Sequence, residues 1–464
     1  MNTAVLNTDR AFKKQRRNAR AAGFTLNGNS VIVFKSMKRY DCVIAGSGPA
    51  GLGTAFALLE KKRNAKILLL ESAEISSGGL RNDCKMNFTY PVGFPSDYWS
   101  TGTASPYIAR IEAFLKPDIL EQIQVDTYAA RAQRIGVTLL RIRQSHLGTD
   151  GGIKLIKDLT ARLAQAGVEL AFGESLVSAD VRSRTAVTDT REIAYGSLVV
   201  APGRHGFDFL RKFMSHTGIR YTDNSIDVGI RVETRREHYP IVADYYDPKF
   251  LFPERTRTFC TNSGSAHVVQ EKYTSTAGQT YYSVNGHAYS DNLPPNGLVN
   301  FAVLRSVAFT EPLASGQDYA EFLAALAMLT GGGHPIMQRI GDFRLGKRTT
   351  AAGLNGDLYD FAPTLKSATP GDISLAMPAK FLESIWKALK KLDTIVPGVL
   401  HPSTVMYYPE IKLYANKPVF LNDHFMAAPD VYLIGDGAGT SRGITGAWAS
   451  GMRAADGIAL AQSW

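Results

Sequence analysis

The first regular pattern of apolar and polar residues begins at residue 40. Residues 40–45 form a short apolar run that is typical of a buried β-strand, and the glycine-rich stretch 46–51 follows at once. Apolar residues then recur at helical spacing, namely Leu52, Ala55, Phe56 and Leu59. A second apolar run at 67–70 ends in Glu71. The order of strand, glycine-rich turn, helix, strand and acid predicts a βαβ unit that binds a dinucleotide.

The residues of the glycine-rich turn have separate predicted tasks. Gly46 permits the tight turn, Gly48 lets the backbone approach a pyrophosphate at the helix N-terminus, and Gly51 lets helix and strand pack closely. Glu71, 20 residues after Gly51, is placed to accept hydrogen bonds from a ribose. The alternative is a glycine-rich structural turn without a ligand. The predicted cofactor contacts of this segment are Gly46, Gly48, Pro49, Ala50, Gly51 and Glu71.

A second strand-to-helix turn near the C-terminus distinguishes flavin from nicotinamide. Residues 431–434 have the pattern of a buried strand that leads to Asp436, and a helical pattern extends from Ile444 to residue 460. A carboxylate at a strand tip can bind the ribityl hydroxyls of a flavin, and a helix N-terminus can stabilise negative charge on the reduced ring. A simple nicotinamide dehydrogenase needs no such turn, so FAD is the predicted cofactor. The predicted contacts are Asp436, Gly443 and Ile444.

A third apolar run, at residues 198–200, ends in a Pro-Gly turn. We expect this strand to lead out of the first domain beside the cofactor, which adds Ala201 and Gly203 to the predicted cofactor contacts. The alternative is an ordinary strand that ends in a turn.

These motifs resemble those of the FAD-binding oxidoreductases of the glutathione-reductase type, and more closely those of the FAD-dependent, or FAD-utilising, dehydrogenases. The residues that carry the resemblance are 46–51, 76–88, 146–150, 200–204, 408–412 and 435–444. The resemblance covers the chain from about residue 40 onward. It implies FAD and redox chemistry, and it implies no particular substrate.

The predicted fold is α/β, with a discontinuous Rossmann-like FAD-binding domain and an inserted α+β substrate domain. We assign residues 39–204 and 413–464 to the FAD-binding domain, with a helical cap at about 105–145. Residues 205–412 form the predicted insertion. No second strand-GxGxxG-helix unit follows, so a dedicated nicotinamide domain is not expected. The electron partner, whether NADH, NADPH or a protein, stays open.

The insertion shows a change of pattern from helices to strands. Apolar and polar residues predict strands at 228–232, 257–260, 267–270, 280–284 and 298–304, and helices at 317–329 and 379–391. Asn285-Gly286 predicts a two-residue hairpin turn.

Candidates for substrate contact and chemistry lie between the two cofactor turns. Gly79 lies where small residues let the backbone approach the cofactor, and Arg81 is a candidate to bind an anionic substrate or phosphate. Cys84 is a candidate redox thiol or flavin contact. Because it has no partner cysteine nearby, a small buried core residue is the competing interpretation.

His146 is the candidate acid or base, since a histidine titrates near neutral pH and precedes the predicted helix 151–166. In the competing interpretation this motif serves only to begin the helix, with Thr149 or Asp150 as its N-cap. Histidine and cysteine spacing predicts no metal site.

The net charge of +10 is concentrated in the N-terminal extension. Residues 1–39 contain nine Lys or Arg residues and one acidic residue, which places +8 there and +2 on the rest of the chain. The body of the protein therefore offers no basis for binding DNA. We expect residues 1–38 to be disordered; a targeting peptide, or contact with polyanions such as RNA or a membrane surface, are the alternatives.

Composition limits the remaining classes. Apolar residues make up 45% and charged residues 20% of the chain, which is typical of a globular protein. The longest apolar run, at residues 322–329, is too short to cross a bilayer. Three well-separated cysteines argue against a disulfide framework and favour the cytoplasm.

The sequence therefore predicts an FAD-dependent oxidoreductase, a dehydrogenase or reductase that transfers hydride between flavin and an unidentified small-molecule substrate. An ene-reductase similar to geranylgeranyl reductase is one alternative. An RNA-associated flavoprotein that uses the basic extension is another.

Overall fold

The computed structural model describes most of the chain from residue 37 to the C-terminus. The described ranges are 37–76, 79–82, 84–203, 206–275, 278–289, 294–310, 312–313, 315–354, 362–413 and 416–464. Residues 1–36 lie outside these ranges, so the expectations for the basic extension stay predictions. Arg39–Trp464 form one compact unit.

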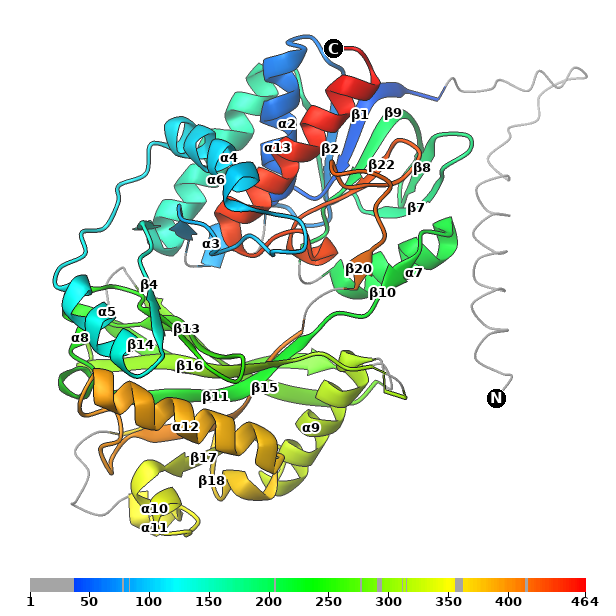
Figure 1. Cartoon of the computed structure of the whole chain (residues 1–464). Coiled ribbons are helices and arrows are strands. Elements are labelled where there is room, and N and C mark those ends of the chain that lie inside the picture. Colours follow the sequence, from blue (N-terminus) through cyan, green and yellow to red (C-terminus); the bar gives the residue numbers. More distant parts are fainter. Residues whose placement is uncertain are drawn as a thin grey trace, which may run out of the picture. The chain divides into compact units, whose positions relative to one another are not determined.

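The first sheet is the predicted parallel α/β sheet (Figure 1). Its parallel strands run in the order β22-β9-β1-β2-β6. Their bounds are β1 (Arg39–Ala45), β2 (Ile67–Glu71), β6 (Glu169–Phe172), β9 (Glu192–Val200) and β22 (Val431–Leu433). β1 and β2 are almost wholly buried because both faces of the sheet are covered, which explains their continuous apolar runs. The fold class predicted from the sequence is confirmed by this topology.

Helices cover one face of the first sheet, and α2 and α13 pack against each other along it (Figure 1). A Cβ on Gly53 would lie 2.6 Å from the carbonyl oxygen of Trp448, and one on Gly451 would lie 2.1 Å from that of Ala50. Small residues therefore let the two helices approach closely. The helices on this face are α2 (Pro49–Lys61), α4 (Thr101–Leu115), α6 (Gly148–Gln165) and α13 (Gly443–Ala461).

The opposite face and the edges of the first sheet carry shorter elements. The helix α7 (Phe207–Thr217) packs there through Leu210, Phe213 and Met214. Antiparallel strands extend the sheet, namely β7 (Leu176–Asp180), β8 (Thr185–Thr188) and β21 (Met426–Ala428). Chain segments that leave and re-enter this part pair as β10 (Tyr221–Thr222) and β20 (Lys417–Pro418).

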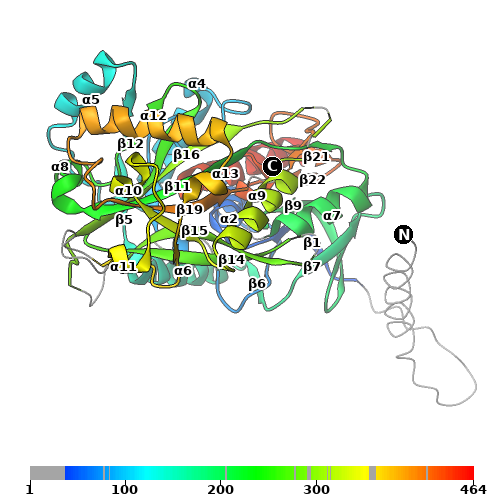
Figure 2. The same cartoon turned by 90° about the horizontal axis from the view of Figure 1, so that it is seen from below.

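The second sheet has the strand order β18-β17-β19-β11-β16-β13-β12-β4 and is antiparallel except for the pair β17–β18. Its strands are β4 (Thr138–Leu140), β11 (Ile226–Arg235), β12 (Lys249–Phe252), β13 (Thr256–Asn262), β16 (Leu298–Val307), β17 (Ile336–Arg339), β18 (Thr369–Pro370) and β19 (Val405–Lys412). The helices α9 (Gly316–Thr330) and α12 (Ala379–Ile395) lie along one face (Figure 2).

Alternation along β11 gives the two faces of the second sheet different characters. Val228, Ile230 and Val232 pack in the apolar core beneath α9 and α12. Arg231 and Glu233 point to the other face, because successive side chains of a strand alternate. That face is covered by the hairpin of β14 (Ser265–Thr274) and β15 (Thr280–Tyr289).

The predicted turn at Asn285-Gly286 is wrong, because both residues lie inside β15 and pair with Val269 and Val268. Close packing, and not a turn, explains why position 286 is a glycine. A Cβ on Gly286 would lie 2.1 Å from Oδ1 of Asn300 and 2.5 Å from the guanidinium of Arg231, so only a glycine admits these buried groups. The other strands and helices predicted in the insertion are present.

The segment predicted as a helical cap, at about 105–145, is divided between the two sheets. The helix α4 packs in the core of the first sheet, whereas Tyr128 of α5 (Val125–Arg134) packs in the core of the second. β4 pairs with β12, and β5 (Gln144–His146) pairs with β3 (Lys85–Asn87). Strands of three residues are too short to give an alternating pattern, so sequence reasoning took this segment as helical.

The helix predicted at 151–166 begins earlier, at Gly148, with Leu147 as its N-cap residue. Thr149 and Asp150 lie in its first turn, so the N-cap prediction is wrong. The chain enters the helix directly from β5, and Gly148 makes the turn with a φ of +68°. The remaining short elements are α3 (Gly79–Asn82), α8 (Ile241–Asp244), α10 (Ile340–Arg344), α11 (Ala351–Leu354), η2 (Arg236–His238), η3 (Ile373–Leu375) and η4 (Asp436–Ala438). None of the helices in the described ranges combines the length and apolar character that crossing a membrane requires.

Candidate functional site

Three glycine-containing turns meet at the carboxyl edge of the first sheet, where ligands of α/β proteins bind. A Cβ on Gly46, after β1, would lie 2.2 Å from the carbonyl oxygen of Ala201, after β9. A Cβ on Gly437, after β22, would lie 2.3 Å from the carbonyl oxygen of Gly203. The structure therefore brings together cofactor residues predicted from three distant parts of the sequence.

The turn after β1 presents an open helix N-terminus. Gly48 is the N-cap residue of α2, and as a glycine it has no side chain that could cap the helix. Pro49 begins the helix. A Cβ on Gly48 would meet no atom within 4 Å, whereas one on Gly51 would lie 1.9 Å from the carbonyl oxygen of Gly46. Gly51 thus serves close packing, and Gly48 borders open space at the positive end of the helix dipole. An anionic group such as a pyrophosphate fits there.

Glu71 tethers the glycine-rich turn from the end of β2. Its Oε2 atom accepts hydrogen bonds from the backbone N–H of Ser47 at 3.0 Å and the hydroxyl of Ser47 at 2.6 Å. Its Oε1 atom accepts from the N–H of Ala73 at 3.1 Å and the hydroxyl of Ser72 at 3.3 Å. Contact with a ribose would require one of the two serine hydroxyls to give way, because a carboxylate has about four acceptor positions.

Asp436 closes the turn between β22 and α13. Its Oδ1 atom accepts a hydrogen bond from the hydroxyl of Ser441 at 2.9 Å, and Oδ2 accepts from the N–H of Gly443 at 3.0 Å. The carboxylate therefore lies at the N-terminus of α13, in whose first turn Ile444 is buried. The hydroxyl of Thr445 is buried in this turn and makes no hydrogen bond to the described part of the chain.

That unpartnered hydroxyl, together with the open turn at Gly48, fits a ligand with polar groups at both ends, as FAD has. Sequence reasoning missed Thr445, although a hydroxyl in the first turn after a glycine-rich loop is a recognisable pattern.

The candidates near α3 lie in contrasting surroundings. Gly79 begins α3, and Arg81 is exposed on the same helix. Cys84 is completely buried, and the packing of α3 on α6 brings its Cβ within 3.1 Å of a Cβ built on Gly152. Since a reactive thiol needs access to its substrate, burial favours the interpretation of Cys84 as a core residue.

His146 lies in β5, where it pairs with Lys85 of β3. Its Nδ1 atom is 2.9 Å from the hydroxyl of Tyr246, and the two rings stack with centroids 5.0 Å apart. Lys85 donates hydrogen bonds to the side-chain oxygen of Asn262 at 2.8 Å and the carbonyl oxygen of Thr261 at 3.0 Å. Sequence reasoning missed Tyr246 and Lys85. Tyr246 belongs to no motif, and Lys85 lies in the stretch 76–88 without any sign there of its contact with Tyr246.

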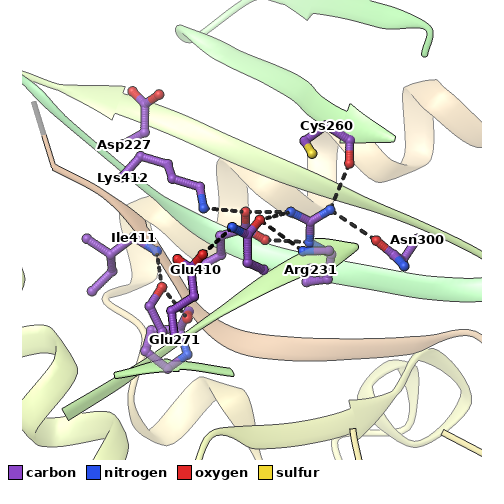
Figure 3. A network of polar contacts seen from close by, with 12 residues as sticks. Asp227, Arg231, Cys260, Glu271, Asn300, Glu410, Ile411 and Lys412 are labelled. Carbon is purple, nitrogen blue, oxygen red and sulfur yellow. Dashed lines mark hydrogen bonds and ion pairs between the residues drawn. The ribbon is translucent and has the colours of Figure 1, made fainter. Parts of the chain in front are cut away.

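A buried network of polar contacts lies between the second sheet and the hairpin strand β15. Figure 3 shows Arg231 at the centre of this network. Nε and Nη2 of Arg231 each donate to a different carboxylate oxygen of Glu410 at 2.8 Å. Nη1 donates to the carbonyl oxygen of Cys260 at 2.8 Å and to Oδ1 of Asn300 at 3.2 Å. Burial alone would lower the pKa of Arg231, but the carboxylate of Glu410 raises it, so the guanidinium stays charged.

A second buried carboxyl, Glu233, lies on the same face of β11. Oε2 accepts from the hydroxyl of Tyr407 at 2.6 Å and from the N–H of Thr364 at 3.1 Å, and Oε1 bonds to the hydroxyl of Thr364. Burial raises the pKa of Glu233 above its ordinary value, although these donors lower it in part.

We expect Glu233→Gln to flatten the pH dependence of stability. A raised folded-state pKa gives stability that is present below the unfolded value and is lost as pH rises through the folded value. Between the unfolded-state pKa and the higher folded-state pKa of Glu233, the parent's free energy of unfolding should therefore fall relative to the variant's by about 1.4 kcal/mol for each unit of rising pH. Urea unfolding between pH 4 and 8 measures this, with the exposed Glu383→Gln as control. Parallel curves for parent and Glu233→Gln would contradict the assignment.

Comparisons with known proteins give only distant likenesses. Neither a protein-family model nor a curated protein matches the sequence. A p-nitrophenol 4-monooxygenase from Pseudomonas putida aligns with 92% of this chain and 81% of its own, at 12% identity and a TM-score of 0.39. A geranylgeranyl bacteriochlorophyll reductase-like protein from Thermoplasma acidophilum aligns with 92% of this chain and 80% of its own, at 12% identity and a TM-score of 0.39.

An L-amino acid deaminase from Proteus myxofaciens aligns with 95% of this chain and 93% of its own, at 13% identity and a TM-score of 0.40. Similarities at this level identify neither a family nor a substrate.

Proposed function

We propose that the chain is an FAD-dependent oxidoreductase that transfers hydride between a small-molecule substrate and flavin. The observation that carries the proposal is the meeting of three turns at one sheet edge, with the open N-terminus of α2 and the start of α13 both contributing. Bound flavin would supply the exchange of a hydride, which is two electrons and one proton, with the substrate.

Each part of the site has a role in this proposal. Gly48 and the first turn of α2 hold the pyrophosphate, and Glu71 lies beside the ribose of the adenosine half. Asp436 and Thr445 hold the ribityl and ring end. The substrate reaches the flavin from the side of the second sheet, and its electron partner is NADH, NADPH or a protein.

Family membership belongs to the same proposal. The motifs support the FAD-binding oxidoreductases of the glutathione-reductase type and, more closely, the FAD-utilising dehydrogenases. The described residues contain one parallel sheet with a glycine-turn helix of this kind.

The test is the colour and content of the purified protein. It should be yellow, and heating should release a flavin that chromatography identifies as FAD. A colourless protein that takes up no added FAD would overturn the proposal.

Asp436→Ala separates flavin binding from general nucleotide binding. The variant loses the two hydrogen bonds to Ser441 and Gly443, each worth about 1.5–3 kcal/mol for a charged group, so the turn at the flavin end loosens. FAD affinity should fall roughly tenfold or more, while ADP, which lacks the ribityl chain, should bind as it does to the parent. Titration of both ligands into the flavin-free proteins measures this, with Asp208→Ala as control. Equal losses for FAD and ADP would show that Asp436 acts on the whole fold.

A further inference from the structure

A histidine, a tyrosine and a lysine from three separate segments meet where β3 and β5 face the second sheet. Nδ1 of His146 and the hydroxyl of Tyr246 are 2.9 Å apart, and Nζ of Lys85 lies 5.2 Å from the centre of the Tyr246 ring. His146 and Lys85 are direct partners in the β3–β5 pair, so their side chains share one face of it. All three are only partly buried, so each remains accessible to a small molecule.

Contacts on both sides hold the cluster of His146, Tyr246 and Lys85 in place. On one side, β3 continues from α3 and packs against α13, the helix that begins at the Asp436 turn. On the other side, Lys85 bonds to Asn262 of β13, and the amide of Asn262 donates to Oδ1 of Asn300 at 3.1 Å. Asn300 in turn accepts from Arg231 of the buried ion pair. The chain of contacts therefore runs from the cofactor side to the core of the second sheet.

We propose that Tyr246 and His146 are the acid–base pair of this enzyme and that Lys85 is a positioning residue for Tyr246. The proposal rests on the proposed function and extends it to a substrate class. It assigns a substrate that loses or gains a proton on oxygen or nitrogen beside the carbon that exchanges hydride, which is an alcohol or amine, or the corresponding carbonyl or imine.

The proton balance of the proposed step is simple. With FAD bound, an alcohol would give up the hydride from its carbon, with both bonding electrons, to the flavin. The hydroxyl proton passes to the oxygen of Tyr246 as the proton of Tyr246 moves to Nδ1 of His146, which becomes imidazolium. The reverse direction returns the proton to the carbonyl oxygen. No further oxidant or reductant is needed.

The surrounding charges favour this arrangement. The carboxylate of Asp247 next to Tyr246 pairs with the ammonium of Lys249 through Oδ2 and accepts a hydrogen bond from the N–H of Thr261 through Oδ1 at 2.9 Å. Burial would raise the pKa of Asp247, but Lys249 and Lys85 lower it below its ordinary value. Asp247 thus stays ionised, and the ammonium of Lys85 above the ring stabilises negative charge that develops on the phenol.

The test compares two oxidants of the photoreduced, FAD-loaded protein in the absence of oxygen. p-Benzoquinone needs two electrons and two protons on its oxygens to become hydroquinone, so it reports on proton delivery, whereas ferricyanide takes single electrons and no proton. Tyr246→Phe keeps the ring but removes the hydroxyl, so we expect reoxidation by p-benzoquinone to slow roughly 100-fold and reoxidation by ferricyanide to stay unchanged. Tyr282→Phe, a tyrosine of β15, is the matched control and should change neither rate.

Lys85 needs its own variants, because a merely structural role would not depend on charge. Lys85→Met should slow the p-benzoquinone reaction about tenfold, and Lys85→Arg should restore most of the rate. Equal slowing with both oxidants in Tyr246→Phe, or no slowing at all, overturns the acid–base pair. Equal rates for Lys85→Met and Lys85→Arg overturn the role of Lys85.

A measurement without flavin separates this inference from the proposed function. The nitrogen NMR shifts of the His146 ring in the flavin-free protein report which ring nitrogen carries the proton. The contact with Tyr246 predicts the form protonated at Nε2, and Tyr246→Phe should move the ring toward a mixture of both forms. An unchanged His146 spectrum overturns the pair, whereas a protein that binds no FAD overturns the proposed function and leaves this measurement to decide the pair.

Discussion

Gly48→Phe is expected to lower FAD affinity at least roughly 100-fold and to leave the stability of the flavin-free protein unchanged. The backbone at Gly48, with φ −69° and ψ −177°, is extended and open to any residue. A Cβ there meets no protein atom within 4 Å, so the phenylalanine ring enters the space that the proposal gives to the pyrophosphate. Loss of two hydrogen bonds to a charged phosphate, at about 1.5–3 kcal/mol each, gives the expected magnitude.

The measurement combines FAD titration by flavin fluorescence with urea unfolding of the flavin-free protein. Gly51→Ala is the contrasting control, because its Cβ would lie 1.9 Å from the carbonyl oxygen of Gly46 and must disturb the packing of α2 on β1. Gly51→Ala should therefore lose stability with or without FAD. If Gly48→Phe bound FAD as the parent does, the pyrophosphate would have to lie elsewhere.

The first sheet could be predicted because its evidence is local. β1, the glycine-rich turn, α2 and β2 follow each other within residues 39–71, and each has its own pattern of apolar residues or glycines. The turn from β22 to α13 is similarly compact. In such segments the residues that define the element are also its neighbours in space.

Two errors arose where a residue is explained by a distant partner. Asn285-Gly286 has the composition of a turn, but Gly286 is required by the approach of Asn300 and Arg231, which lie on other strands. β4 is a strand because β12 pairs with it, more than 100 residues later. A single sequence carries no record of either contact.

The same distinction applies to the candidate site. The cofactor turns could be named from motifs, whereas the partners of His146 could not, because Tyr246 and Lys85 reach it through tertiary packing. The hydrogen bonds of Asp436 to Ser441 and Gly443 in its own turn could also not be read from its position at a strand tip.

Glu410→Ala is expected to lower the free energy of unfolding by about 3–5 kcal/mol, the cost of leaving a buried charge without its partner. Arg231 and Glu410 have completely buried side chains, and the guanidinium would keep only the neutral oxygens of Cys260, Asn285 and Asn300. The hairpin strand β15 covers this face of the sheet and limits the access of water to the guanidinium. Urea unfolding followed by circular dichroism measures the loss.

The double variant Arg231→Met/Glu410→Leu removes both charges and provides the control. Replacing a buried pair with apolar residues of similar size is often neutral or stabilising, so most of the lost free energy should return. Lys412, whose ammonium lies 3.2 Å from Glu410, loses an ion pair in the single and the double variant alike and cancels in the comparison. If Glu410→Ala and the double variant were equally unstable, the loss would come from what both variants lack, the ion pair of Lys412, and the unpaired charge of Arg231 would not be its source.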